Sequence, residues 1–141
     1  MSLIIRPFQP DDATTLRSLF LETRRAAFVW LNHESLQLAD FDTATQDEPI
    51  LVATLGEKIV GFVSWWPPEN FVHNLFVDMA HQQQGIGEQL LAACLKEIGR
   101  PATLKCMEKN VRALGFYERH GWQIASEGTS EDGAYFLMRL S

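Results

Sequence analysis

Apolar and polar residues follow two periods along this chain, and each period predicts one kind of element. A period of two, or a short apolar run between turn residues, predicts strands. Strands are expected at residues 3–8, 49–55, 58–66, 71–77, 103–106, 122–126 and 134–140. Apolar positions three or four apart predict helices: one that Asp11 or Asp12 caps and that reaches Ala27, one that opens at Gly85 and ends at Gly99, and one at residues 110–120.

These elements follow one another in the order β-α-α-β-β-β-α-β-α-β-β, where residues 31–44 supply a short second helix and an irregular acidic stretch. Residues 59–63 are apolar at both parities, so their strand is expected to be covered on both faces. The order predicts an α/β (α+β) fold with a single mixed, mostly antiparallel sheet flanked by helices on both sides.

Composition narrows the class of protein. A chain of 141 residues with 46% hydrophobic residues suits one core, and we expect residues 1–141 to form a single domain. The formal net charge is −6 and the only basic doublet is Arg24-Arg25, which argues against a nucleic-acid partner. No membrane span or signal peptide is expected, and Cys94 and Cys106 suit buried thiols, so we expect a cytoplasmic protein.

A glycine-bearing turn, residues 82–87 (QQQGIG), joins an expected strand to an expected helix. Main-chain N–H groups at such a helix start can bind an anion. A dinucleotide fingerprint would need a third glycine where this chain has Leu90, and a Walker loop would need lysine where it has Glu88. Both nucleotide interpretations therefore fail, and an ordinary strand-to-helix turn remains the alternative to an anion site.

A second run, residues 110–117 (NVRALGFY), places a tyrosine on a helix that ends at Gly121. Together the two runs resemble the motifs of the GCN5-related N-acetyltransferase (GNAT) superfamily. Q-x-x-G-x-G follows an apolar strand, as in that family's acyl-coenzyme A cradle, and N-x-x-A-x-x-F-Y is followed by glycine and an aromatic residue. The matching positions of the second motif are Asn110, Ala113, Phe116, Tyr117, Gly121 and Trp122. The resemblance covers about residues 71–122 and implies the acyl-CoA N-acyltransferase fold.

The resemblance implies acetyl-CoA as cofactor, with its pyrophosphate on the N–H groups of residues 83–87 and its thioester oxygen near a strand N–H at Phe76 or Val77. The cofactor-binding residues that it implies are Phe76, Val77, Gln82, Gln83, Gln84, Gly85, Ile86, Gly87, Asn110 and Tyr117. Two positions depart from the family pattern: many members have arginine at the position of Gln82, and Glu88 would repel a phosphate unless it points outward.

Two residues are candidates for catalysis. The resemblance implies that the phenol of Tyr117 protonates the leaving thiolate. His73 and Asn74 interrupt the otherwise apolar residues 71–77, and many family members place a carboxylate there, so His73 is a candidate general base. His33, Glu34 and ordered water are rivals for the base, and no metal ligand set is expected.

These features predict an enzyme, an N-acetyltransferase that moves an acetyl group from acetyl-CoA to a primary amine, with a small-molecule amine as acceptor. Two alternatives are a non-catalytic acyl-CoA sensor or interaction module on the same scaffold and an acetyltransferase for protein N-termini or lysines. The acceptor pocket is expected from residues 28–42 and 65–68 and from the start of the fourth strand. The candidates for an aromatic wall are Phe28, Trp30, Trp65, Trp66 and Phe71, and at least half of them are expected to belong to the core instead. A homodimer is compatible with the scaffold, although no residue specifies its interface.

Overall fold

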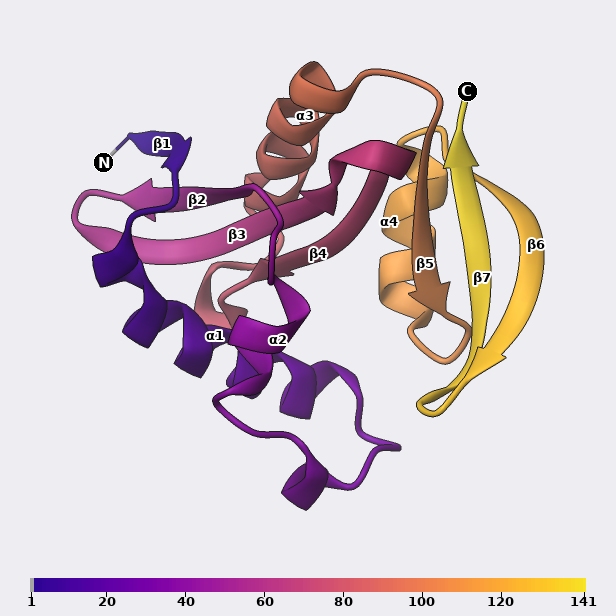
Figure 1. The fold of residues 1–141 in the computed structure, drawn as a ribbon, viewed down its shortest axis with the longest axis horizontal. Coiled ribbons are helices and arrows are strands. Elements are labelled where there is room, and N and C mark those ends of the chain that lie inside the picture. The colour runs from indigo at the N-terminus through magenta and orange to yellow at the C-terminus, as the bar shows by residue number, and fades with distance from the viewer. Residues whose placement is uncertain (1) are drawn as a thin grey trace.

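The computed structural model describes residues 2–141 and contains a seven-stranded sheet with the order β1-β2-β3-β4-β5-β7-β6 (Figure 1). The strands are β1 (Leu3–Pro7), β2 (Ile50–Leu55), β3 (Lys58–Trp66), β4 (Phe71–Val77), β5 (Ala102–Met107), β6 (Gln123–Ser130) and β7 (Gly133–Leu140). The α-helices are α1 (Ala13–Ala27), α2 (Asp40–Ala44), α3 (Ile86–Ile98) and α4 (Val111–Arg119). Short 3-10 turns are η1 (Pro10–Asp12), η2 (His33–Ser35), η3 (Pro67–Glu69) and η4 (Met79–His81).

Strand pairing confirms the predicted mixed, mostly antiparallel sheet. Only β4 and β5 run parallel, and their register contains two pairs, Phe71 with Thr103 and Val72 with Leu104. Beyond these pairs the two strands diverge, as Figure 1 shows where β4 and β5 separate below their common start. The sheet therefore opens between β4 and β5, because β4 has no partner on that side beyond Val72 and β5 has none beyond Leu104.

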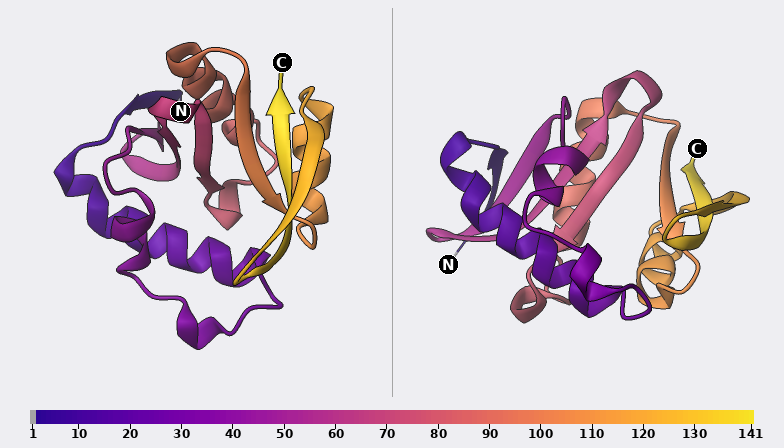
Figure 2. Two further views of the ribbon diagram at one scale, coloured as in Figure 1. Left: turned by 45° about the vertical axis from the view of Figure 1, so that its right-hand side comes forward. Right: turned by 60° about the horizontal axis from the view of Figure 1, so that its bottom comes forward.

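Helices cover both faces of the sheet (Figure 2). On one face α3 supplies Ile86, Leu90 and Cys94 to a buried cluster with β3, β5 and β7, and α4 packs beside it. On the other face α1 and α2 enclose a second cluster around Phe20, Phe41 and Phe62. The central strand β3 is buried along most of its length, as its apolar residues at both parities predict.

The C-terminal hairpin differs from its predicted extent. β6 continues to Ser130, four residues past its predicted end, and Ser130 pairs with Gly133 at the turn. Residues 127–130 are polar or glycine, and most of β6 is exposed, so no apolar pattern reveals the extension. Pairing with β7 defines these residues as a strand.

Gly61 in β3 is required by close packing, and we expect Gly61→Ala to destabilise the fold. A Cβ at this position would lie 2.8 Å from the carbonyl oxygen of Phe76 and 3.1 Å from Cδ1 of Leu90. The carbonyl belongs to the neighbouring strand and cannot move freely, so overpacking is expected to cost about 1–3 kcal/mol of unfolding free energy. Thermal unfolding followed by circular dichroism measures the loss as a lower Tm.

Gly115→Ala is the matched control for this substitution. Gly115 lies inside α4, and its added Cβ would meet only the flexible end of Arg119, at 3.2 Å. Alanine favours a helix interior over glycine by about 1 kcal/mol, so the Tm of this variant is expected to hold or to rise. Equal Tm values for Gly61→Ala and the parent chain would contradict the packing interpretation.

Candidate active site

The opening between β4 and β5 begins at a β-bulge. Trp65 pairs with Val72 and Ser64 with Asn74, so His73 is the extra residue on β4. Val72 is also the last β4 residue paired with β5. His73 therefore stands at the apex of the opening, and the bulge brings its side chain to the same face as Asn74, where both join one hydrogen-bonded network.

The turn between β4 and α3 presents a run of main-chain N–H groups with no partner. Within the described residues, none of the N–H groups of residues 83–88 makes a hydrogen bond of ordinary geometry. Gln83 and Gly85 both have positive φ, at 65° and 81°, which folds this run into a concave turn at the start of α3. The helix dipole adds to these N–H groups, so the turn suits an anion such as a pyrophosphate.

Gln82 fastens this turn to the end of β4. Its Nε2 donates to the carbonyl oxygen of Val77 at 3.1 Å, so the side-chain amide is engaged by the protein itself. In an extended strand the main-chain N–H and C=O of one residue point to one side, and those of the next residue point to the other side. Asp78 points toward β3, because its N–H donates to the carbonyl oxygen of Val60. Alternation therefore directs the N–H groups of Leu75 and Val77 toward the opening.

Phe76 lies between those two residues and turns its side chain to the α1 face. Its ring packs edge-on against Phe20 at a centroid distance of 5.0 Å and stacks with Phe62 at 5.9 Å. The ring thus anchors β4 to the aromatic cluster under α1. The same alternation directs the N–H of Phe76 toward β3.

Helix α4 stands beside the turn. A Cβ at Gly87 would lie 3.7 Å from Phe116 of α4 and 3.7 Å from Val77 of β4, so the start of α3, the end of β4 and α4 meet there. Oε2 of Glu88 lies 3.6 Å from Nε2 of His120, which directs the carboxylate toward α4. Nδ1 of His120 donates to the carbonyl oxygen of Phe116 at 2.7 Å.

Tyr117 lies on α4 beside Phe116. Its ring packs edge-on against Phe116 at 5.3 Å and Trp122 at 6.1 Å, and no hydrogen bond engages its hydroxyl within residues 2–141. Burial, with a smaller contribution from nearby Cys106, raises the pKa of Tyr117 above its usual value, so the phenol is protonated at neutral pH. Asn110 caps α4 as expected, because its Oδ1 accepts from the N–H of Ala113 at 3.3 Å.

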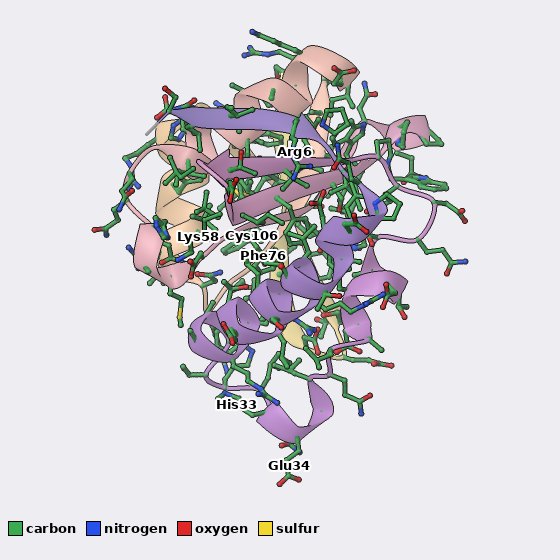
Figure 3. All side chains as sticks on the ribbon, turned by 90° about the vertical axis from the view of Figure 1, so that its left-hand side faces the viewer. Arg6, His33, Glu34, Lys58, Phe76 and Cys106 are labelled. Atoms are coloured by element: carbon green, nitrogen blue, oxygen red, sulfur yellow. The ribbon has the colours of Figure 1, made fainter. Side chains whose placement is uncertain are left out.

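Glu48, which no sequence pattern marks, lies against His73. Its Oε2 is 2.8 Å from Nδ1 of His73, and its Oε1 accepts from the hydroxyl of Ser64 at 2.9 Å. The Glu48 side chain is only 6% exposed, whereas that of His73 is 42% exposed. The rival bases lie elsewhere: Figure 3 shows His33 and Glu34 on the outlying turn η2, and neither forms an ion pair or hydrogen bond with His73 in the part of the chain described.

One residue expected on the acceptor side, Trp65, lies in the core instead. Trp65 is 5% exposed and belongs to the core cluster under α3, because the bulge pairs it with the buried Val72. It cannot contribute to an open aromatic wall. Trp30, in the loop after α1, donates from Nε1 to the carbonyl oxygen of Asp132 at 3.1 Å, and Figure 1 shows this loop beside the β6–β7 turn. This contact connects the two halves of the sheet across the opening.

Both cysteines are buried free thiols, as expected. Burial raises the pKa of Cys94 to about 12 and that of Cys106 to about 11, so neither is a nucleophile at neutral pH. Within residues 2–141, no group of three or more His, Cys, Asp or Glu side chains could hold a metal ion. No helix in the same range has the length and apolar character that crossing a bilayer requires.

Comparison with known proteins agrees with this geometry. The family model described as an acetyltransferase (GNAT) domain matches residues 46–124, more than half of the chain and including β4, the turn, α3 and α4. Among curated proteins, none matches the chain in sequence.

Solved structures show the same fold over the whole chain. A GCN5-related N-acetyltransferase from Rhodopseudomonas palustris is 22% identical and has a TM-score of 0.81, with 100% of this chain and 96% of that one covered. The PaiA N-acetyltransferase of Thermoplasma acidophilum, solved with coenzyme A, has a TM-score of 0.82 at 16% identity, with both chains fully covered. YncA of Salmonella typhimurium, a putative acetyltransferase solved with acetyl-CoA, has a TM-score of 0.75 at 18% identity over 100% and 94% of the two chains.

Proposed function

This chain belongs to the GNAT family of acetyltransferases, and we propose that it transfers an acetyl group from acetyl-CoA to the primary amine of a small molecule. The observation that carries the proposal is the run of unpartnered N–H groups at residues 83–88, beside an opening in the sheet that α4 flanks. The coenzyme A and acetyl-CoA complexes of the two structural neighbours support the same cofactor.

The residues of the turn fit a diphosphate. Hydrogen bonds to a charged group contribute about 1.5–3 kcal/mol each, so three or four N–H groups of residues 83–87 could hold a pyrophosphate without a lysine. Gln82 contributes by holding the turn against Val77. Oε2 of Glu88 lies 3.6 Å from Nε2 of His120, so its carboxylate is directed toward α4.

Each catalytic residue has a defined task in this proposal. When bound, acetyl-CoA supplies the acetyl group as a thioester. The N–H groups of Leu75 and Val77 are oriented to donate hydrogen bonds to the carbonyl oxygen as it gains charge. His73 accepts the proton of the amine, directly or through water, and Tyr117 donates its proton to the leaving sulfur. Asn110 caps α4 through its Oδ1, which leaves its amide N–H₂ group for the cofactor.

A thiol-release screen tests the proposal directly. Purified protein with acetyl-CoA is offered polyamines, amino acids, aminoglycosides and peptides, and free thiol is measured with a chromogenic reagent. Cys94 and Cys106 give little background because they are buried and remain protonated. We expect the highest rate of thiol release with a small amine and a lower rate with every peptide.

Two outcomes would overturn this proposal. Binding of acetyl-CoA without thiol release for any acceptor would identify a non-catalytic sensor. Faster release with peptides than with every small amine would identify a protein acetyltransferase.

A further inference from the structure

We propose that Glu48 is a positioning residue for the transfer reaction: its carboxylate holds the His73 ring with Nδ1 protonated and leaves Nε2 to accept the proton. The inference rests on the acetyl transfer proposed above, in which His73 is the base. It adds a residue from the loop before β2, 25 positions earlier in the chain than His73.

A chain of hydrogen bonds determines the direction of each donor. The amide nitrogen of Asn74 can only donate, and it reaches both the carbonyl oxygen of Ala44 at 3.1 Å and Oγ of Ser64 at 2.8 Å. The hydroxyl of Ser64 therefore uses its own proton for Oε1 of Glu48, at 2.9 Å. Oε2 remains free to accept from His73, so a neutral His73 carries its proton on Nδ1.

Burial makes this arrangement rigid. Ser64 is fully buried and Asn74 is 6% exposed, so the chain that ends at Glu48 is fixed by the sheet and by the end of α2. His73 alone extends toward solvent, with 42% of its side chain exposed. A buried carboxylate behind a half-exposed imidazole fixes the orientation and the tautomer of the ring.

The bulge makes the contact possible. In a regular strand His73 and Asn74 would point to opposite faces, and only one of them could join this network. The extra residue in β4 lets His73 contact Glu48 while Asn74 contacts Ser64. Glu48 also lines a hollow that His73 does not reach, and the other charged residue of that hollow is Glu97 of α3.

Kinetics of single and double variants test the inference. We expect Glu48→Ala to lower kcat by about 10- to 100-fold, which is part of the roughly 10²–10⁴-fold that a positioned base contributes, with KM for acetyl-CoA unchanged. In a His73→Gln background, Glu48→Ala is expected to cause no further loss of kcat, because Glu48 acts through the imidazole. Multiplying losses in the double variant would overturn the inference.

Two further variants separate positioning from structure. Glu48→Gln keeps the size of the side chain, but its one oxygen accepts from the Ser64 hydroxyl and its NH₂ group faces Nδ1 of His73. The ring then takes the wrong tautomer, and kcat is expected to stay as low as in Glu48→Ala. Glu97→Ala changes a carboxylate of the same hollow that does not contact His73, and its kcat is expected to equal that of the parent chain. A kcat in Glu48→Gln close to that of the parent chain would contradict the inference.

A spectroscopic measurement distinguishes failure of this inference from failure of the proposed function. Nitrogen-15 NMR of the His73 ring reports its tautomer without any acetyl transfer. The parent chain is expected to show protonated Nδ1 and the Glu48→Ala variant a mixture of tautomers. The same tautomer in both would overturn the role of Glu48, whereas thiol release that fails with every amine would overturn only the transfer reaction.

Discussion

Gly85→Asp is expected to abolish binding of acetyl-CoA while the domain remains folded. Gly85 precedes α3 in a left-handed conformation, and a Cβ there would meet no atom within 4 Å, so the fold has space for a side chain. A carboxylate at this position would lie among the N–H groups proposed to hold the pyrophosphate. Two like charges about 4 Å apart near a protein surface repel by about 4 kcal/mol, which corresponds to a loss of affinity on the order of 10³-fold.

Isothermal titration calorimetry with acetyl-CoA measures the affinity, and thermal unfolding confirms that the variant is folded. Gly85→Asn is the matched control because asparagine has the same shape, tolerates the left-handed conformation and carries no charge. The asparagine variant is expected to retain most of the affinity. Normal affinity of Gly85→Asp would exclude the turn as the pyrophosphate site, and equal losses in both variants would show that the backbone rather than charge is responsible.

Local patterns predicted the elements that carry the site. The bounds of β4 agree with its apolar run, which follows the turn at Pro67-Pro68, and α3 ends where Gly99 interrupts its apolar repeat. Asn110 is also recognisable from the sequence as a helix cap, because a cap needs only a side-chain oxygen within reach of a main-chain N–H three residues later. Each of these features depends on residues close together in the sequence, where propensity and capping act directly.

Features that depend on distant partners could not be predicted in this way. The bulge at His73 adds one residue without changing the apolar pattern of β4, and Glu48 reaches it from a different loop. Trp30 and Asp132 are 102 positions apart, and their contact exists only because the sheet folds. The burial of Trp65 depends on its pairing with Val72, which no local pattern of the sequence indicates.

Tyr117→Phe is expected to lower kcat by about 10²–10⁴-fold, the usual contribution of a positioned acid, while the dissociation constant of acetyl-CoA changes by less than about threefold. Phenylalanine preserves the ring that packs on Phe116 and Trp122. The lost hydroxyl has no hydrogen-bond partner within residues 2–141, so the free energy of unfolding is also expected to be preserved. Steady-state kinetics and calorimetry measure the two effects separately.

The pH dependence of the parent chain gives a second test of the acid. Because burial raises the pKa of Tyr117, the protonated donor persists to a higher pH than an ordinary tyrosine, whose pKa is about 10. Turnover should therefore show no fall from ionisation of this phenol below about pH 10. The ratio of kcat between the parent chain and Tyr117→Phe is accordingly expected to stay constant between neutral pH and that limit.

Tyr135→Phe is the matched control, since Tyr135 is the other tyrosine of the two in the chain. Its ring lies over Gly128 of the neighbouring strand and near Lys105, so the substitution removes a hydroxyl from the sheet rather than from α4. Full turnover is expected for this variant. A loss of kcat in both variants would indicate a change in folding or solvation. An unchanged kcat in Tyr117→Phe would remove the phenol from the reaction and leave water as the proton donor to the leaving sulfur.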